Sequence, residues 1–276
     1  MPTSEEFRVP DRRVPAGCTG RDEGLSTAKA WPRRWSPARI LRRLKGSSGG
    51  QAGDGREQAL VAHVLASTAR GDLDAVISAI DQFAYQQAFL INVGDEKGEI
   101  LDAAVHATQP SRLLELGTYC GYSALRIARV MPAGAHLWSV EQDTRNAGVA
   151  TQIWRHAGVG DRVSCVVGAL GDNGRTMERL SGEHGFATAN LDLVFIDHTK
   201  DQYLPDLRRI LDRGWLHAGS VVVADNVKVP GAPAYHAYLR EREGIDWRTT
   251  EHPTHLEYQQ EIADLVLESE YLGSRS

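Results

Sequence analysis

The sequence predicts an α/β protein with a doubly wound, mostly parallel β-sheet. From residue 112 onward, short β-branched runs alternate with amphipathic runs, which is typical of parallel strands covered by helices on both faces. Residues 56–108 carry apolar positions at helical spacing, which indicates extra helices ahead of the first strand. Acidic residues or glycines follow the strand-like runs directly, at the sheet edge where such proteins bind ligands.

The first 55 residues differ in composition from the rest. They are rich in Arg, Pro, Gly and Ser and end in GSSGGQAGDG, which is typical of a flexible linker. Residues 1–48 carry 11 Lys and Arg against 5 Asp and Glu, a net +6, so the remaining residues carry −11. We predict a basic, mostly disordered arm over 1–55 and one domain over 56–276. The segment WSPARILRRLK also fits an amphipathic turn in weak contact with a membrane surface, although a disordered tail is the simpler interpretation.

Composition narrows the class of protein. No apolar run approaches the roughly 20 residues that span a bilayer, and the N-terminus lacks the apolar core of a signal peptide, so we expect a cytoplasmic protein. The acidic domain argues against a broad nucleic-acid surface. Cys18, Cys120 and Cys165 have no metal-binding spacing and indicate a reducing compartment. No prediction follows for the oligomeric state.

Two helices are predicted over residues 56–87, because a turn at Gly71 and an acidic stretch after it interrupt the helical spacing. A third helix is expected from Glu99 to Thr108, closed by Pro110. Alternating strand-like and helix-like runs then continue to about residue 241. The C-terminal run HLEYQQEIADLVL predicts a pair of strands, antiparallel at an edge of the sheet.

The predicted strands end in residues that suit a binding site. Acidic side chains end four of the five strands, and the carboxyl ends of parallel strands meet at one edge of a sheet. We therefore expect these side chains to form one site. The strand ends, in chain order, are Glu115–Gly117, Glu141, Gly168, Asp197–His198 and Asp225–Asn226.

The stretch ELGTYCGYS after the first predicted strand indicates a cofactor loop. Gly117 lets a ligand approach the backbone, and a helix beginning near Tyr122 offers free N–H groups. Glu141, 24 residues after Gly117, suits the two hydroxyls of a ribose. The pattern E-x-G-x-x-x-G is typical of S-adenosylmethionine (SAM)-dependent methyltransferases, whereas a dinucleotide site would have G-x-G-x-x-G. A generic strand-to-helix turn remains an alternative for this stretch.

Asp197, Asp225 and Asn226 predict a Mg²⁺ site. Their oxygens are hard donors at the ends of neighbouring strands, and no Cys or His pair with zinc spacing accompanies them. Three protein oxygens leave about half of an octahedron for water and substrate. The alternative is that each aspartate caps a following helix, but D-H-x-K together with D-N favours the metal.

At these motifs the chain resembles the catechol O-methyltransferase family. The resemblance runs from about Arg56 to Leu267 and includes NVGDEKG, LLELGTYCGYSALRIAR, LVFIDHTKDQYLPD, VVVADNVKVPGAP and LEY. It implies the Rossmann-like class I methyltransferase fold. It also implies that Asp197, Asp225 and Asn226 hold Mg²⁺ and that Lys200 is the general base.

The resemblance implies further site residues. Glu257 would hold the second catechol hydroxyl, and Asn92 would lie beside the methyl-transfer locus. A half-buried structural imidazole is the alternative role for His198. The implied substrate contacts are Phe89, Lys200, Asn226, Pro230 and Glu257, and the implied cofactor contacts are Val93, Glu115, Gly117, Tyr119, Tyr122, Ser123, Glu141 and His198.

Three departures from the animal enzymes concern the cofactor and the substrate. Thr199 stands where those enzymes have a tryptophan over the adenine, and Leu170-Gly171 replaces a Ser-Gln pair that contacts the adenine. Ile91 and Phe89 stand for a methionine and a tryptophan near the reacting centre. These changes bear on cofactor affinity and on substrate shape, and they leave the metal and base set intact.

The expected activity is transfer of a methyl group from SAM to one hydroxyl of a Mg²⁺-chelated catechol. A metal-dependent O-methyltransferase for another vicinal diol, or for hydroxylated uridine in tRNA, is the alternative; the acidic domain argues against RNA, although the basic arm could compensate. The glycine spacing and the metal triplet argue against an NAD-dependent dehydrogenase. An inactive binding module is disfavoured because every catalytic position is filled.

Overall fold

The computed structural model describes residues 54–273. The predicted arm, with its amphipathic segment, lies outside the described residues except for its last two positions. Within the described part of the chain, no helix is both long and apolar enough to cross a membrane.

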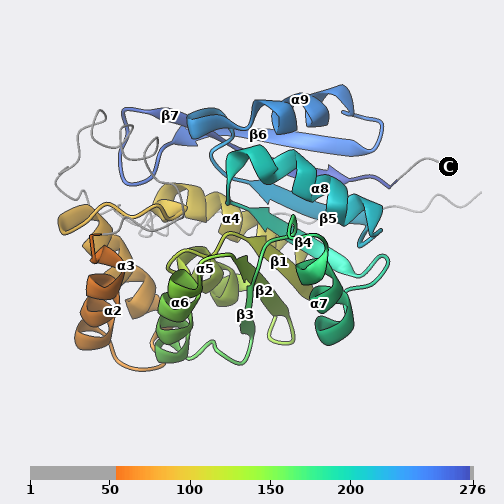
Figure 1. Cartoon of the computed structure of the whole chain (residues 1–276). Coiled ribbons are helices and arrows are strands. Elements are labelled where there is room, and N and C mark those ends of the chain that lie inside the picture. Colours follow the sequence, from red (N-terminus) through yellow and green to blue (C-terminus); the bar gives the residue numbers. More distant parts are fainter. Residues whose placement is uncertain (1–53, 274–276) are drawn as a thin grey trace, which may run out of the picture. The chain divides into compact units, whose positions relative to one another are not determined.

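Seven strands form one sheet in the order β3-β2-β1-β4-β5-β7-β6 (Figure 1). The first five are parallel, whereas β7 runs antiparallel to both β5 and β6. This confirms the doubly wound class with an antiparallel edge. The strands are β1 (Arg112–Leu116), β2 (His136–Glu141), β3 (Val163–Val167), β4 (Leu191–Ile196), β5 (Leu216–Ala224), β6 (Trp247–His255) and β7 (Ala263–Tyr271).

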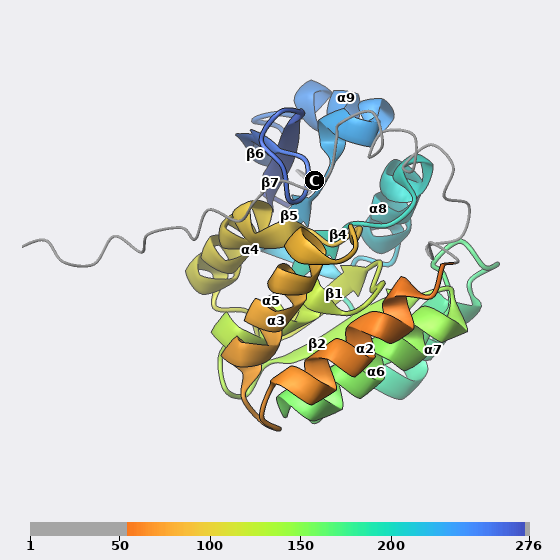
Figure 2. The same cartoon turned by 90° about the vertical axis from the view of Figure 1, so that its left-hand side faces the viewer.

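Helices cover both faces of the sheet (Figure 2). Those before β3 pack in one hydrophobic cluster, and those after it pack in a second. The first group is α2 (Arg56–Ser67), α3 (Leu73–Gln86), α4 (Gly94–Thr108), α5 (Tyr122–Val130) and α6 (Thr144–Ala157); the second is α7 (Arg175–His184), α8 (Tyr203–Asp212) and α9 (Pro233–Glu241). Two short helical turns, η1 (Lys200–Gln202) and η2 (Val227–Gly231), follow β4 and β5.

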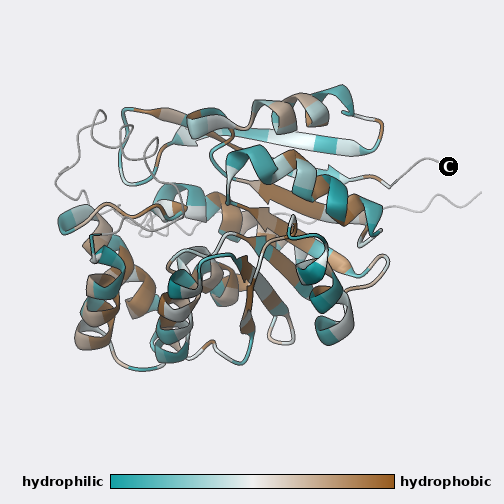
Figure 3. Cartoon of the chain, viewed as in Figure 1, coloured by the Kyte–Doolittle hydropathy of each residue, from teal (hydrophilic) through white to brown (hydrophobic). Residues whose placement is uncertain are grey.

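The central strands are apolar on both faces, as Figure 3 shows by their brown colour. Successive side chains of a strand point to opposite faces. Leu113 therefore joins the first cluster and Leu114 the second, and in β4 Phe195 and Ile196 divide in the same way. Burial on both faces explains why these strands appear in the sequence as continuous apolar runs.

Helix α4 begins at Gly94, five residues before the predicted start at Glu99. The prediction left all of NVGDEKG outside the helix. Asp95 and Glu96 instead form an acidic first turn, which favours a helix N-terminus. Gly98 makes room for a neighbour, because a Cβ there would lie 2.6 Å from Nη1 of Arg126.

The C-terminal strands are antiparallel at the edge, as predicted, but they lie elsewhere in the sequence. The run HLEYQQEIADLVL holds mainly the connection between β6 and β7, and β6 begins upstream at Trp247. Strand β6 is polar and contains Pro253, so its sequence lacks a clear strand pattern. Proline is tolerated in a strand at a sheet edge.

Candidate active site

The carboxyl ends of the parallel strands meet at one edge of the sheet. Backbone hydrogen bonds continue the ladder one step past each strand: Gly117 N donates to Val140 O, Asp197 N to Leu116 O, and Asp225 N to Ile196 O, at 2.9–3.0 Å. The residues after β1, β4 and β5 therefore start from fixed, neighbouring positions. This is why the residues of the predicted site come together.

A cavity of about 540 Å³ lies at this edge. The residues that follow all five parallel strands line it, and so do Asn92 and Val93 before α4 and Glu257 from the β6–β7 connection. Of the cofactor contacts that the sequence suggested, the following line the cavity: Val93, Gly117, Tyr119, Tyr122, Ser123, Glu141 and His198.

The loop after β1 is tightly held. Gly117 has a φ of 101°, and a Cβ there would lie 2.4 Å from the carbonyl oxygen of Asp197, so only glycine fits. Glu141 Oε2 accepts hydrogen bonds from the N–H groups of Thr118 and Tyr119 at 3.2 and 2.9 Å. These contacts hold the Glu141 carboxylate at the cavity wall, and the absent Cβ of Gly117 lets the ends of β1 and β4 lie close together.

Glu115 lies behind the cavity wall and does not line it. Its side chain is fully buried and accepts hydrogen bonds from the hydroxyls of Ser123 and Ser139. Burial raises the pKa of Glu115 to about 8. Its place fits a support for Ser123 better than direct contact with a ligand.

His198 lines the cavity and also has a structural partner. Its Nε2 lies 2.8 Å from Oδ2 of Asp206, and its ring stacks on Tyr203 with centroids 5.3 Å apart. Among residues 54–273, its buried Nδ1 has no hydrogen-bond partner. The imidazole is thus held at one nitrogen, and its other nitrogen meets no group of the described residues.

Lys200 lies between two groups of the predicted metal site. Its Nζ donates to Asp197 Oδ1 at 2.9 Å and to the hydroxyl of Tyr203 at 2.5 Å. The Tyr203 hydroxyl in turn donates to the backbone oxygen of Asp225 at 3.0 Å. Lys200 therefore links the ends of β4 and β5 and borders the cavity.

Asp225 and Asn226 have oxygens left for a cation. Asp225 is fully buried; its Oδ1 accepts from Lys97 Nζ at 2.8 Å and from the Asn226 N–H, whereas its buried Oδ2 has no partner within the described part of the chain. The Asn226 amide nitrogen donates to Glu257 and Asp264 at 2.7 and 2.8 Å, which leaves its oxygen for another ligand. An unpartnered buried carboxylate oxygen is costly unless a cation or donor meets it, so these residues fit a metal.

Neither aspartate caps a helix. Thr199 and Asn226 occupy the N-cap positions of η1 and η2, and neither turn has a side-chain cap. The alternative role for Asp197 and Asp225 therefore has no counterpart in the structure.

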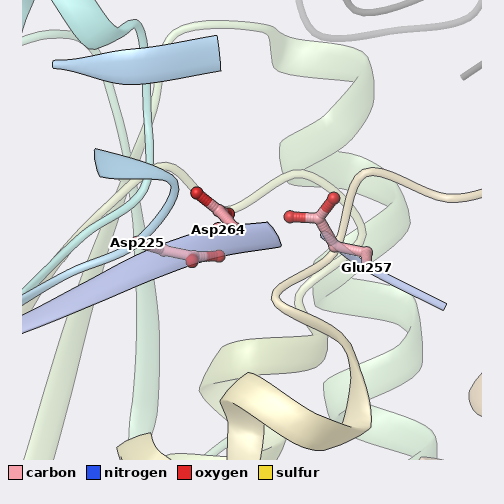
Figure 4. A group of neighbouring side chains, drawn as sticks. All are labelled: Asp225, Glu257 and Asp264. Carbon is pink, nitrogen blue, oxygen red and sulfur yellow. The ribbon is translucent and has the colours of Figure 1, made fainter. Parts of the chain in front are cut away.

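Lys97 and Asp264 complete the site and were not predicted. Lys97 Nζ contacts Asp225, Glu257 and Asp264 at 2.8, 2.5 and 3.2 Å. Burial alone would lower the pKa of Lys97, but the three carboxylates outweigh it and raise the pKa. Figure 4 shows Asp225, Glu257 and Asp264 close together, and one oxygen of each lies within 4.8 Å of the others. Lys97 stands in NVGDEKG, but nothing in that motif indicated its partners.

The remaining suggested contacts divide between cavity and core. Pro230 lines the cavity, whereas Phe89 is buried in a small apolar cluster with Leu256. Five positions differ from the animal enzymes. Four of them line the cavity, namely Ile91, Leu170, Gly171 and Thr199, whereas Phe89 does not. These four differences therefore lie where a bound molecule could meet them.

Comparison with known proteins identifies the family. A family model described as O-methyltransferase matches residues 68–236. A probable O-methyltransferase of Mycobacterium tuberculosis, Rv1703c, is 62% identical over 81% of this chain and 95% of its own length. Mouse catechol O-methyltransferase is 39% identical over 81% of this chain and 82% of its own. Zebrafish catechol O-methyltransferase B is 43% identical over 79% of this chain and 80% of its own length.

Solved structures agree in fold. The O-methyltransferase TomG from Streptomyces achromogenes, in complex with SAM, superposes with a TM-score of 0.58 at 24% identity, over 81% of this chain and all of that one. An O-methyltransferase from Bacillus cereus, in complex with SAH, superposes with a TM-score of 0.56 at 20% identity, over 77% of this chain and 90% of that one. The chain thus belongs to the O-methyltransferase family, together with the catechol O-methyltransferases.

Proposed function

We propose that this O-methyltransferase transfers a methyl group from SAM to one hydroxyl of a catechol held with Mg²⁺, and that Lys200 is the general base. The observation that carries the proposal is the unpartnered, buried Oδ2 of Asp225, beside Asn226, Asp197 and Lys200. The substrate class follows the names of the mouse and zebrafish relatives.

SAM is the proposed donor because the loop after β1 suits it. Gly117 lines the cavity, Glu141 offers a carboxylate to a ribose, and α5 begins directly behind the loop. The structural neighbours from Streptomyces achromogenes and Bacillus cereus contain SAM or SAH in the same fold.

Asp197, Asp225 and Asn226 would hold the metal. Each has an oxygen at the strand-end edge, and hard oxygen ligands suit Mg²⁺. Mg²⁺ bound there would supply charge that stabilises a phenolate, since free phenols titrate near pH 10.

Lys200 would take the hydroxyl proton. As a neutral amine its Nζ would accept that proton, and Asp197 Oδ1 and the Tyr203 hydroxyl would then hold the resulting ammonium in the geometry observed. The hydroxyl oxygen attacks the methyl carbon, the O–C bond forms as the S–C bond breaks, and the bonding pair remains on sulfur. No further reactant is required.

Glu257 would bind the hydroxyl that is not methylated. Its Oε1 accepts from Lys97 and from Asn226, so Oε2 is the oxygen available to a ligand, and Glu257 lines the cavity. A substrate with two adjacent hydroxyls can then meet both the metal and Glu257. A monophenol would leave one of these partners unsatisfied.

Radiolabel transfer from SAM tests the proposal against its alternatives. We expect transfer to catechol, loss of transfer in EDTA, recovery with Mg²⁺, and transfer to guaiacol about 10⁴-fold slower, because a site built for a hydroxyl rejects an analogue that lacks it. Transfer to tRNA but not to catechol would favour an RNA substrate. Undiminished transfer without metal would refute the proposed metal site.

A further inference from the structure

Lys97 is an unusual residue for its surroundings. It comes from the second turn of α4, its side chain is only 1% exposed, and its Nζ contacts carboxylates from β5, from the β6–β7 connection and from β7. Lysine is almost never fully buried unless it is paired. Here a single ammonium pairs with three carboxylates from three segments.

The three carboxylates lie close enough together for one oxygen of each to bind the same cation. One oxygen each of Asp225, Glu257 and Asp264 lies within 4.8 Å of the other two, and all three side chains are buried (Figure 4). Three like charges this close are unfavourable without a cation among them. The Lys97 ammonium lies at hydrogen-bond distance from all three residues, so it occupies this position itself.

The charges of the whole site balance for one metal ion. With the carboxylates ionised and Lys200 counted as the ammonium that it is before it loses its proton to act as the base, four negative charges come from Asp197, Asp225, Glu257 and Asp264, and two positive charges come from Lys97 and Lys200. One divalent cation neutralises the remainder. Without Lys97 the uncompensated negative charge grows by one. The carboxylates that lose their partner are those near the proposed metal position.

We propose that Lys97 is a positioning residue: its ammonium aims Asp225 and Glu257 at metal and substrate, and it fills the place where a second divalent cation would otherwise bind. The proposal rests on the proposed function. Lys97 binds Oδ1 of Asp225 and Oε1 of Glu257, so Oδ2 and Oε2 are the oxygens left for ligands. The chain thereby keeps a mononuclear site within a cluster of four carboxylates.

Manganese binding tests both parts, with the number of Mn²⁺ ions per chain and their affinity read from calorimetry and electron paramagnetic resonance. We expect one Mn²⁺ in the wild type and two, magnetically coupled, in Lys97→Met. The control is Lys228→Met, the same change at an exposed lysine of η2, which should bind one Mn²⁺ like the wild type. One Mn²⁺ with wild-type affinity in Lys97→Met would overturn the proposal.

A second variant decides the question even if Lys97→Met does not fold. Lys97→Met/Asp264→Asn removes one positive and one negative charge together, so the charge of the site stays constant. We expect one Mn²⁺ bound about tenfold more weakly, as when the support of a metal ligand is lost. Wild-type affinity in this double variant would refute the positioning role. A wild-type chain that binds no Mn²⁺ would instead overturn the proposed metal site, and this inference with it.

Discussion

Gly117→Ala should lower the affinity of the proposed metal site, although Gly117 lies in the loop after β1 that we propose to bind the cofactor. Gly117 follows β1, and Asp197 follows the neighbouring strand β4. An alanine Cβ would lie 2.4 Å from the Asp197 carbonyl oxygen, whereas real Cβ contacts essentially never fall below 3.0 Å. One methyl group would therefore force the two strand ends apart at the residue that we propose as a metal ligand.

The structure sets the size of the effect. The contact must lengthen by at least 0.6 Å, and the φ of 101° adds backbone strain for alanine of about 1–3 kcal/mol. Displacement of a reacting group by about 1 Å can cost on the order of 10²-fold in rate. We expect a lower melting temperature, weaker Mn²⁺ binding and a fall in kcat/KM of about 10²-fold.

Thermal unfolding, Mn²⁺ titration and methyl transfer to catechol measure the three effects. Gly148→Ala is the matched control, since Gly148 lies exposed within α6 with nothing near its Cβ position. Alanine there should stabilise the helix by up to about 1 kcal/mol and leave metal affinity unchanged. The reasoning is refuted if Gly117→Ala matches the wild type in stability and in Mn²⁺ affinity.

Further predictions concern the base, a buried carboxyl and the arm. Lys200→Ala should lower the rate of methyl transfer to catechol by about 10²–10⁴-fold, and the loss should be smaller for 4-nitrocatechol, whose hydroxyl ionises without a base. Equal losses of rate on both substrates would contradict a general base. Burial raises the pKa of Asp81 from 3.8 to about 7, so its contribution to stability is present below about pH 4 and lost as the pH rises through about 7. Asp81→Asn should remove this dependence, so its stability relative to the wild type should rise by up to about 4 kcal/mol between about pH 4 and pH 8; a constant difference in denaturant titrations would contradict it. Deletion of residues 1–50 should leave catechol turnover unchanged, because every proposed site residue lies beyond residue 88; a large loss would assign the arm a role in catalysis.

The sheet was predictable because its strands have strong local signals. Strand β4 closes with the apolar run LVFI, which Asp197 follows, and β5 closes with VVVA, which Asp225 follows. The polar residue at each end marks the point where the chain leaves the core. Because β4 and β5 are neighbours, the end-of-strand rule was enough to group Asp197, Asp225 and Asn226.

Lys97 and Asp264 were not predictable by that rule. Both belong to regular elements, one inside α4 and the other inside β7, so neither stands where a polar residue signals a strand end. Their partner Asp225 is 128 and 39 positions away in the sequence, and only the packing of α4 and β7 against β5 brings them together. A lysine in a helix is also, on average, an exposed residue.

The prediction of where α4 begins was wrong for a related reason. Gly98 is unfavourable inside a helix, because glycine weakens a helix by about 1 kcal/mol relative to alanine. In the fold, the missing Cβ makes room for the guanidinium of Arg126, which also binds Asp102 of α4. A local penalty is thus offset by a contact between elements that the sequence alone does not reveal.

The chemistry of the site depends on which atom of each residue is left unused, and this lies beyond sequence motifs. Asp225 gives Oδ1 to Lys97 and to the Asn226 N–H, and Oδ2 remains; Asn226 gives its amide nitrogen to Glu257 and Asp264, and its oxygen remains. An asparagine with its amide turned the other way would match the same motif but would present its nitrogen, which cannot bind a cation, in place of its oxygen. The motif thus names the proposed ligands, whereas contacts with Lys97 and Asp264, from other elements, leave Asp225 Oδ2 and the Asn226 oxygen for the proposed metal.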